Sequence, residues 1–189
     1  ADNMLSLEDN KANIIETFKK LLKTKKYREV TLESILNEVK LSKYAFYKIF
    51  PSKQDLVATI FQQEIMEEII YQMDKDNYQK RMHSLAVYLN KNKEFYANVF
   101  PLAQQQKLKH LFDIFIEKQV DILSKAYLAG KRVLYNDQRY ISDYFLSAFA
   151  YLVNEWIGGR YRFSVLEFAD KWLLLINSGL RDFITNYRA

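Results

Sequence analysis

The sequence contains no cysteine, and only two prolines and four glycines occur among its 189 residues. Without cysteine, the chain can form neither a disulfide nor a catalytic thiol, which agrees with a reducing compartment such as the cytoplasm. Proline and glycine are the residues that most often interrupt helices, so their scarcity favours long helical segments. The composition therefore predicts an all-α protein.

The motifs of common enzymes and of membrane or secreted proteins are also missing. There is no signal peptide and no apolar run of about eighteen residues, so neither secretion nor a membrane partner is indicated. The two histidines, His83 and His110, are not spaced as metal ligands, and no phosphate-binding glycine loop or nucleophile motif occurs. We therefore predict no metal, no cofactor and no enzymatic activity, and we expect a cytoplasmic location.

Positive charge is concentrated at the N-terminal end of the chain. Residues 1–53 contain eleven Lys and Arg against seven Asp and Glu, a net charge of +4, whereas residues 54–189 contain seventeen against sixteen. Lysine-rich surfaces attract the phosphates of nucleic acids irrespective of base sequence. The distribution predicts a segment that faces a polyanion, although a solvated, lysine-rich helix face gives the same count.

Three short amphipathic helices are predicted in this basic segment. In the first, over residues 9–26, apolar residues recur at helical spacing: Ile14, Phe18, Leu21 and Leu22. Thr31 precedes the second helix, whose apolar spacing continues to Val39, and Ser42 precedes the third, over residues 43–50. Both hydroxyl residues are typical N-caps, so the two helices are predicted to be joined by a tight turn.

The stretch LSKYAFYKIFPSK (residues 41–53) puts two kinds of side chain on opposite sides of the third helix. The stripe expected to face the first two helices is apolar: Phe46, Ile49 and Phe50. The stripe expected to be exposed is basic and aromatic: Lys43, Tyr44, Tyr47 and Lys48. Pro51 ends this helix, and Ser52 with Asp55 predicts a capping box for the next. Lys53 lies in that first turn, where a cation opposes the helix dipole unless an anion is bound nearby.

Longer helices are predicted over the rest of the chain. Their expected ranges are about 53–73, 77–92, a short helix ending near Pro101, 104–129, 138–159, and a last helix from a Ser164/Glu167 capping box to Tyr187. Gly130 and the Gly158–Gly159 pair are the expected stops, and Asp137 is an expected cap. We predict a boundary in or beside the fourth helix, with a head over residues 1–53 and a helical body over residues 54–189.

The segment VTLESILNEVKLSKYAFYKIFPSKQDLV (residues 30–57) resembles the N-terminal signature of the TetR family of transcriptional regulators. The similarity covers about a quarter of the chain, with the cap, turn, third helix and following lysine in order. Three positions depart from the family pattern: Lys40 replaces the usual turn glycine, and Lys48 and Ile49 replace an aromatic residue and a histidine. The segment LNKNKEFYANVF (residues 89–100) is similar to a C-terminal subtype found in regulators near dihydroxyacetone kinase operons.

The resemblance implies a helix-turn-helix head that places its third helix in the major groove of a double-stranded DNA operator. The residues expected to contact DNA are Thr31, Ser42, Lys43, Tyr44, Ala45, Tyr47, Lys48 and Lys53. Of these, Lys43, Tyr44 and Ala45 begin the third helix and are expected at base edges. The others are expected to bind phosphates.

For the body, the resemblance implies a helical bundle that dimerises and binds an unknown small-molecule effector, so that a homodimeric repressor is released from DNA. The expected dimer interface comprises Phe145, Phe149, Leu152, Trp172, Leu175 and Phe183. The expected effector pocket comprises Tyr88, Tyr96, Phe112, Phe115, Tyr144 and Phe149. Both sets are also typical of an intramolecular core. Two alternatives stay open: an activator controlled by a partner protein, and a helical sensing or interaction protein without specific DNA binding.

Overall fold

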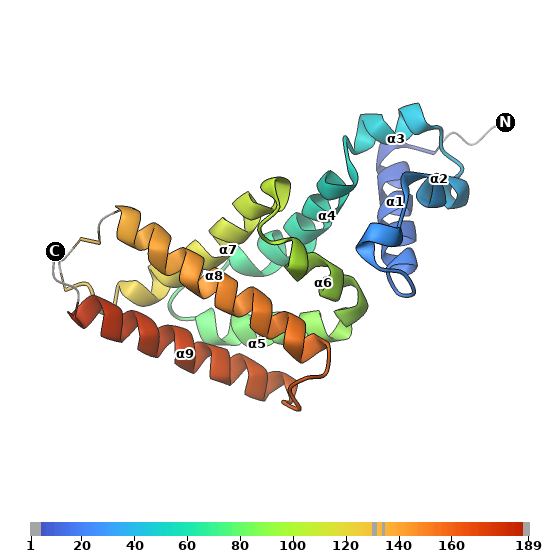
Figure 1. Cartoon of the computed structure of the whole chain (residues 1–189). Coiled ribbons are helices and arrows are strands. Elements are labelled where there is room, and N and C mark those ends of the chain that lie inside the picture. The colour runs from blue at the N-terminus through green and yellow to red at the C-terminus, as the bar shows by residue number, and fades with distance from the viewer. Residues whose placement is uncertain (1–4, 130–131, 134, 187–189) are drawn as a thin grey trace. The chain divides into compact units, whose positions relative to one another are not determined.

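The computed structural model describes residues 5–129, 132–133 and 135–186, and across these ranges it is helical without strands, which confirms the all-α prediction (Figure 1). The chain divides into two compact units, Ala1–Ile60 and Phe61–Ala189. The division falls within the helical segment that follows Lys53, in the fourth helix rather than at its start.

From residue 5 onward, the first unit consists of three helices, a connecting turn and most of a fourth helix. The elements are α1 (Leu7–Leu21), the 3-10 turn η1 (Tyr27–Glu29), α2 (Leu32–Val39), α3 (Lys43–Ile49) and α4 (Lys53–Phe61). Apolar side chains spaced along these helices meet in a small core in which each is at most 2% exposed: Ile14, Phe18, Ile35, Phe46 and Phe50. The predicted apolar stripes are therefore confirmed for this unit.

A π-helix, η2 (Gln62–Ile70), continues α4 without a break. At its end, the amide of Tyr71 donates to the carbonyl of Met66 at 2.9 Å, a bond across five residues instead of four. The sequence predicts one regular helix over this span, since nothing in its apolar spacing separates a π-helix from an α-helix. The π-helix turns four side chains into the core of the second unit: Ile65, Met66, Ile69 and Ile70.

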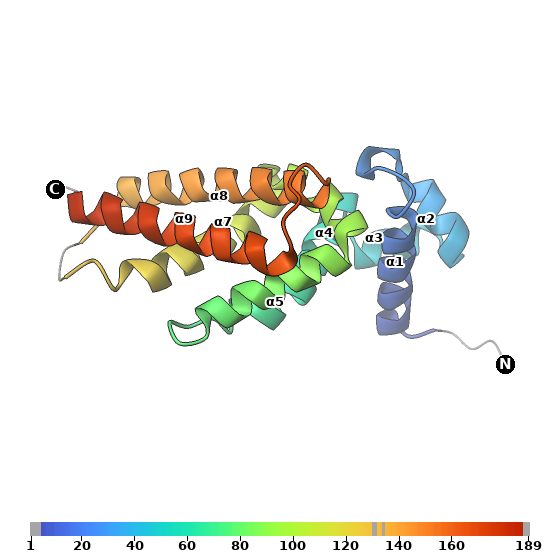
Figure 2. The same cartoon turned by 90° about the horizontal axis from the view of Figure 1, so that it is seen from below.

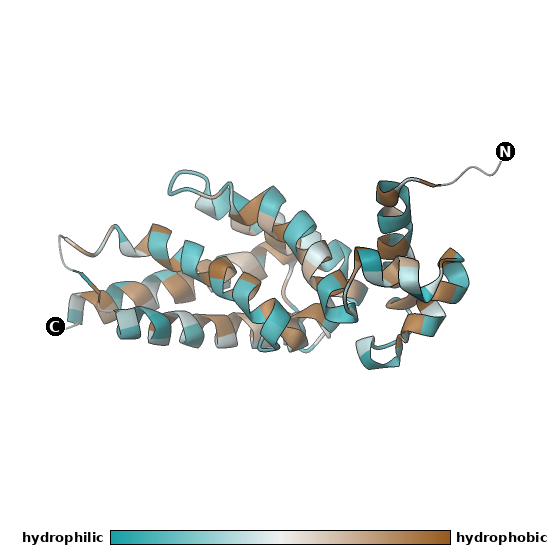
Figure 3. Ribbon diagram, turned by 90° about the horizontal axis from the view of Figure 1, so that it is seen from above, coloured by the Kyte–Doolittle hydropathy of each residue, from teal (hydrophilic) through white to brown (hydrophobic). Residues whose placement is uncertain are grey.

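Over the residues that the structure describes, the second unit contains η2, five further helices and one short turn. The elements after η2 are α5 (Tyr78–Lys91), α6 (Lys93–Val99), the 3-10 turn η3 (Phe100–Leu102), α7 (Gln106–Ser124), α8 (Tyr135–Ile157) and α9 (Val165–Asn186). The two last helices lie side by side in both views, and α9 also packs on α5 and α7 (Figures 1 and 2). Figure 3 shows hydrophobic and hydrophilic residues side by side along these helices, as expected when one face packs and the other is solvated.

Two predicted helix ends in this unit are wrong. The seventh helix ends at Ser124 and not at residue 129, because the Ser124 carbonyl accepts from the amides of both Tyr127 and Leu128 in a tight turn. The predicted stop, Gly130, lies outside the described residues. The eighth helix begins at Tyr135, so Asp137 lies inside its first turn and is not its cap.

The other predicted signals in this unit are confirmed. Gly159 ends α8 with a φ of 86°, in the left-handed region where glycine is unstrained. The Ser164 amide donates to the Glu167 carboxylate at 2.8 Å, and the Glu167 amide donates to the Ser164 hydroxyl at 3.2 Å. These two bonds form the capping box of α9.

Candidate nucleic-acid interface

Two capped helices and one strained residue form the α2–turn–α3 segment. The hydroxyl of Thr31 accepts the amide of Ser34, and the hydroxyl of Ser42 accepts the amide of Ala45, each at 3.1 Å. Lys40 ends α2 with a φ of 55°, and its amide donates to the Leu36 carbonyl at 2.9 Å. The turn therefore needs the left-handed conformation that a glycine supplies without strain, and here a lysine adopts it.

The exposed face of α3 is basic and aromatic. Tyr44 is 71% exposed and Tyr47 is 45% exposed, and Lys43 and Lys48 are exposed beside them. Each lysine lies near the tyrosine four residues away: the Lys48 ammonium is 4.6 Å from the Tyr44 ring, and the Lys43 ammonium is 5.9 Å from the Tyr47 ring. Ala45, the other predicted base-contacting residue, is half-buried. This face is exposed, and it places positively charged ammonium groups next to flat aromatic rings.

Lys53 has a different environment from the one predicted. Its ammonium donates to the carbonyls of Tyr27 and Val30 at 2.7 and 3.0 Å and lies 4.0 Å from the centre of the Tyr27 ring. Burial in this position lowers the pKa of Lys53. The side chain therefore connects the start of α4 to the segment before α2, across 26 residues of sequence. No local pattern could have shown this contact.

A hollow of about 300 Å³ opens beside these groups. Three of the predicted DNA-contacting residues line it, Thr31, Tyr47 and Lys53, together with Arg28 and Ser52. The remaining predicted residues lie on the exposed side or at the cap of α3. Arg28 also lines this hollow, although no helical pattern or motif in the sequence points to it.

Comparison with known proteins identifies this arrangement. Residues 14–60 match the sequence model of the bacterial regulatory proteins of the tetR family, and residues 76–178, more than half of the chain, match that of a transcriptional regulator C-terminal region of the same family. The chain belongs to the TetR family of transcriptional regulators. Members of this family are transcription factors and not enzymes, so the prediction of a non-enzymatic regulator is confirmed.

One curated relative is the HTH-type dhaKLM operon transcriptional activator DhaS of Lactococcus lactis subsp. lactis (strain IL1403), 27% identical over 108 residues. The match covers 57% of this chain and 57% of the relative's length. The solved structure of the dihydroxyacetone kinase operon activator DhaS covers 92% of this chain and 97% of its own, with a TM-score of 0.61 and 20% identity. The repressor NalD of Pseudomonas aeruginosa covers the same shares with a TM-score of 0.57 and 14% identity. The structures share the fold, and the sequence match supports the DhaS subtype.

Most of the predicted effector residues of this TetR regulator lie in the core of the second unit. Four of them are completely or almost completely buried and pack with neighbouring rings in the core: Tyr96, Phe112, Phe115 and Phe149. Tyr88 is half-buried, whereas Tyr144 is 66% exposed. The Tyr96 hydroxyl donates to Glu64 on η2 at 2.7 Å, and burial together with this carboxylate raises the pKa values of Tyr88 and Tyr96. Apolar spacing alone could not separate a filled core from a pocket.

Three predicted dimer residues are also part of the core. Phe145, Phe149 and Trp172 are at most 6% exposed and contact one another between α8 and α9, so they do not lie on a surface that a second subunit could contact. Leu152 and Phe183 are half-buried, and only Leu175 is well exposed. The exposed large apolar residues of the two helices include Leu175 and five that were not predicted as dimer residues: Tyr140, Tyr144, Tyr151, Leu166 and Leu174. These side chains point outward because the larger aromatic residues of the same helices, such as Phe145, Phe149 and Trp172, occupy the opposite, inward side.

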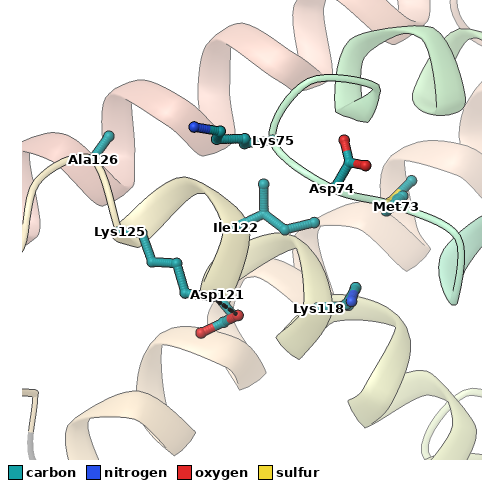
Figure 4. A pocket seen from close by; sticks show the side chains of 8 residues that line it. All are labelled: Met73, Asp74, Lys75, Lys118, Asp121, Ile122, Lys125 and Ala126. Atoms are coloured by element: carbon teal, nitrogen blue, oxygen red, sulfur yellow. Dashed lines mark ion pairs between the residues drawn. The ribbon is translucent and has the colours of Figure 1, made fainter.

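A second hollow, of about 660 Å³, lies between the turn before α5 and the end of α7 (Figure 4). Its polar lining includes Lys75, Lys118 and Lys125, and Lys75 and Lys125 lie on either side of Ile122 in the close-up. Asp121 forms an ion pair with Lys125 at 3.1 Å. Asp74 accepts the amides of two following residues in its own turn at 2.8 and 2.9 Å. Three lysines against two aspartates give the lining a net positive charge of one, so the hollow is slightly basic.

Over the described ranges, no helix is long and apolar enough to cross a membrane. Within those same ranges, no three His, Cys, Asp or Glu side chains come together as metal ligands.

Proposed function

We propose that this TetR regulator binds DNA in a sequence-specific manner as a homodimer in the cytoplasm, and that a ligand or partner of its second unit controls this binding. The observation that supports the proposal is the exposed face of α3, where two lysines and two tyrosines lie together. This helix is the second of two capped helices joined by a tight turn. A B-DNA major groove is about 12 Å wide and admits one such helix.

The positions along α3 suggest a division of roles. Lys43 and Tyr44 begin the helix and are exposed, so they are assigned to base edges, with Ala45 beside them at a thymine methyl group. Tyr47 and Lys48 lie further along and are assigned to phosphates. Thr31 and Ser42 present a helix N-terminus each, where backbone amides favour an anion.

Dimerisation is assigned to exposed apolar side chains of α8 and α9, the six residues from Tyr140 to Leu175 described above. Two long helices from each subunit can form a four-helix interface, and exposed leucines and tyrosines of this kind are typical of such contacts. A two-fold dimer would present two α3 helices to a palindromic operator.

The basic hollow at the end of α7 is the candidate effector site, because its volume is in the range of small-molecule sites and its lining combines lysines with an apolar floor of Met73, Ile122 and Ala126. Repression released by such an effector is the first candidate mode of regulation. Activation, with a partner protein acting on the second unit, is the second candidate, favoured by the similarity to the activator DhaS.

The experiment that tests this function compares binding to the DNA upstream of the chain's own coding sequence with binding to random DNA of equal length, across a salt series. A sequence-specific regulator is expected to prefer a specific site by a factor on the order of 10³ or more at physiological salt. Equal, steeply salt-dependent binding to both fragments would support a sensing protein without specific DNA recognition. A reporter placed under the bound region then gives the sign, because deletion of the gene raises expression for a repressor and lowers it for an activator.

A further inference from the structure

The ammonium of Lys53 is half-buried and is bound by its own protein. Two of its three N–H groups donate to the carbonyls of Tyr27 and Val30, and the Tyr27 ring covers it at 4.0 Å. A phosphate oxygen would compete with these two charge-assisted bonds, which are the stronger kind of hydrogen bond. Lys53 is therefore poorly placed as the cation that the hollow beside α2 offers to DNA.

Arg28 is the cation in this hollow that stays available. It belongs to η1, its side chain is exposed, and it makes no hydrogen bond or ion pair to any part of the chain that the structure describes. Its guanidinium can bind two oxygens of one phosphate with parallel N–H groups. Thr31 and Tyr47 line the same hollow and place hydroxyls beside it.

The position of Arg28 depends on Lys53. Arg28 lies between Tyr27 and Val30, the two residues whose carbonyls Lys53 holds. Within the segment itself, the Val30 amide reaches the Tyr27 carbonyl at 3.3 Å, and the Glu29 amide reaches the Lys26 carbonyl at 2.8 Å. The Lys26 amide also donates to the Glu29 carboxylate at 2.7 Å. All of these bonds lie within the turn, so the contacts to Lys53 tie the turn to the start of α4.

We infer that Arg28 binds a phosphate of the DNA backbone in this hollow, and that Lys53 is a positioning residue that holds Arg28 there. The inference rests on the proposed DNA-binding function. It concerns a contact to the backbone, so it applies to random duplex DNA as well as to an operator.

The test is the salt dependence of binding to random duplex DNA by the full chain and four variants: Arg28→Ala, Lys53→Met, the double variant, and Lys23→Ala. Loss of one phosphate contact lowers the slope of log K against log salt by about 0.9. Arg28→Ala is expected to show this loss, with affinity about tenfold lower near 0.15 M salt. Lys23→Ala removes an exposed lysine of the same unit outside the hollow and is expected to change affinity less than twofold.

The double variant separates positioning from a second contact. If Lys53 acts through Arg28, the slope of the double variant falls by the same single step as that of Arg28→Ala. A fall of two steps would show that Lys53 binds its own phosphate, which would overturn its assignment as a positioning residue.

An unchanged slope for Arg28→Ala would overturn the inference even if Lys53→Met failed to fold. Binding without sequence preference but with a slope that depends on Arg28 would support the inference and contradict the sequence-specific part of the proposed function. No binding of the wild-type chain to duplex DNA would contradict both.

Discussion

Lys40 adopts a backbone conformation that is strained for any residue with a Cβ atom, and this strain lowers the stability of the fold. Its φ of 55° lies in the left-handed region, and its side chain is exposed. The Lys40→Gly variant is therefore expected to raise the free energy of unfolding by about 1 kcal/mol, because glycine adopts this conformation without strain. Urea denaturation measures the change. Lys40→Ala keeps the Cβ atom and is the matched control; an equal gain from alanine would mean that the strain does not come from the backbone.

Because of its buried tyrosines, the protein is expected to lose stability at alkaline pH. Burial raises the pKa values of Tyr78 and Tyr96 in the folded protein, so the folded state favours the protonated phenol. Their contribution to stability is complete below the unfolded-state value of about 10 and is lost as the pH rises above it. The free energy of unfolding is expected to fall from pH 8 to pH 11, and to fall less in Tyr96→Phe.

The matching measurement is urea denaturation at both pH values. Tyr140→Phe, at an exposed tyrosine, is the control and is expected to keep the wild-type fall. The same fall in Tyr96→Phe and in the wild type would show that Tyr96 does not carry the pH dependence.

At the scale of single elements, α8 and α9 approach each other closely at Gly179. A Cβ atom there would lie 2.9 Å from Cζ of Phe145, whose ring is buried against Trp172. Overpacking costs about 1–3 kcal/mol, and alanine returns about 1 kcal/mol of helix propensity. Gly179→Ala is therefore expected to lower the melting temperature.

A Phe145→Leu background provides the control for that substitution. The shorter side chain frees the space next to residue 179, so Gly179→Ala is expected to cost less there than in the wild type. Thermal unfolding of the wild type, the two single variants and the double variant gives the coupling free energy between residues 145 and 179. A coupling of zero would mean that the Phe145 ring does not limit this position.

The outer face of α8 and α9 is the element-scale feature assigned to dimerisation. Leu174 and Leu175 are 67% and 57% exposed, and charges placed there would be buried in the proposed interface. The Leu174→Glu, Leu175→Glu double variant is expected to sediment as a monomer at micromolar concentration, whereas the wild type sediments as a dimer. Val87→Glu changes another exposed apolar residue, on α5, and is expected to stay dimeric. A monomeric wild type would contradict the assignment.

The elements that sequence analysis predicts well are those set by neighbours three or four residues apart. The caps at Thr31 and Ser42 and the apolar stripe through Phe46 depend only on local spacing, and all three are present. The contact of Lys53 with Tyr27 and the inward side of Phe145 depend on tertiary packing. A local pattern contains no information about which partner such a side chain meets, so these two contacts could not be predicted.

At the scale of the whole molecule, the two units differ in what their sequences reveal. In the first unit, the charged and aromatic residues lie on an exposed helix face that charge and helical spacing can predict. The family match over residues 14–60 agrees with that prediction. The second unit uses many aromatic residues, and most of them fill its core, so composition did not locate a ligand site. The basic hollow at the end of α7 depends on a turn and a helix far apart in the sequence.

The most direct test of the central claim is a selection of binding sites from a pool of random duplex DNA, with the wild-type chain and with Lys43→Ala. The account predicts that the wild type enriches an inverted repeat whose half-sites are separated by about one helical turn or a multiple of it. It also predicts that Lys43→Ala loses preference at one base pair in each half-site, at a cost of about 1–3 kcal/mol. Failure of the wild type to enrich any motif would contradict the claim that α3 recognises DNA sequence.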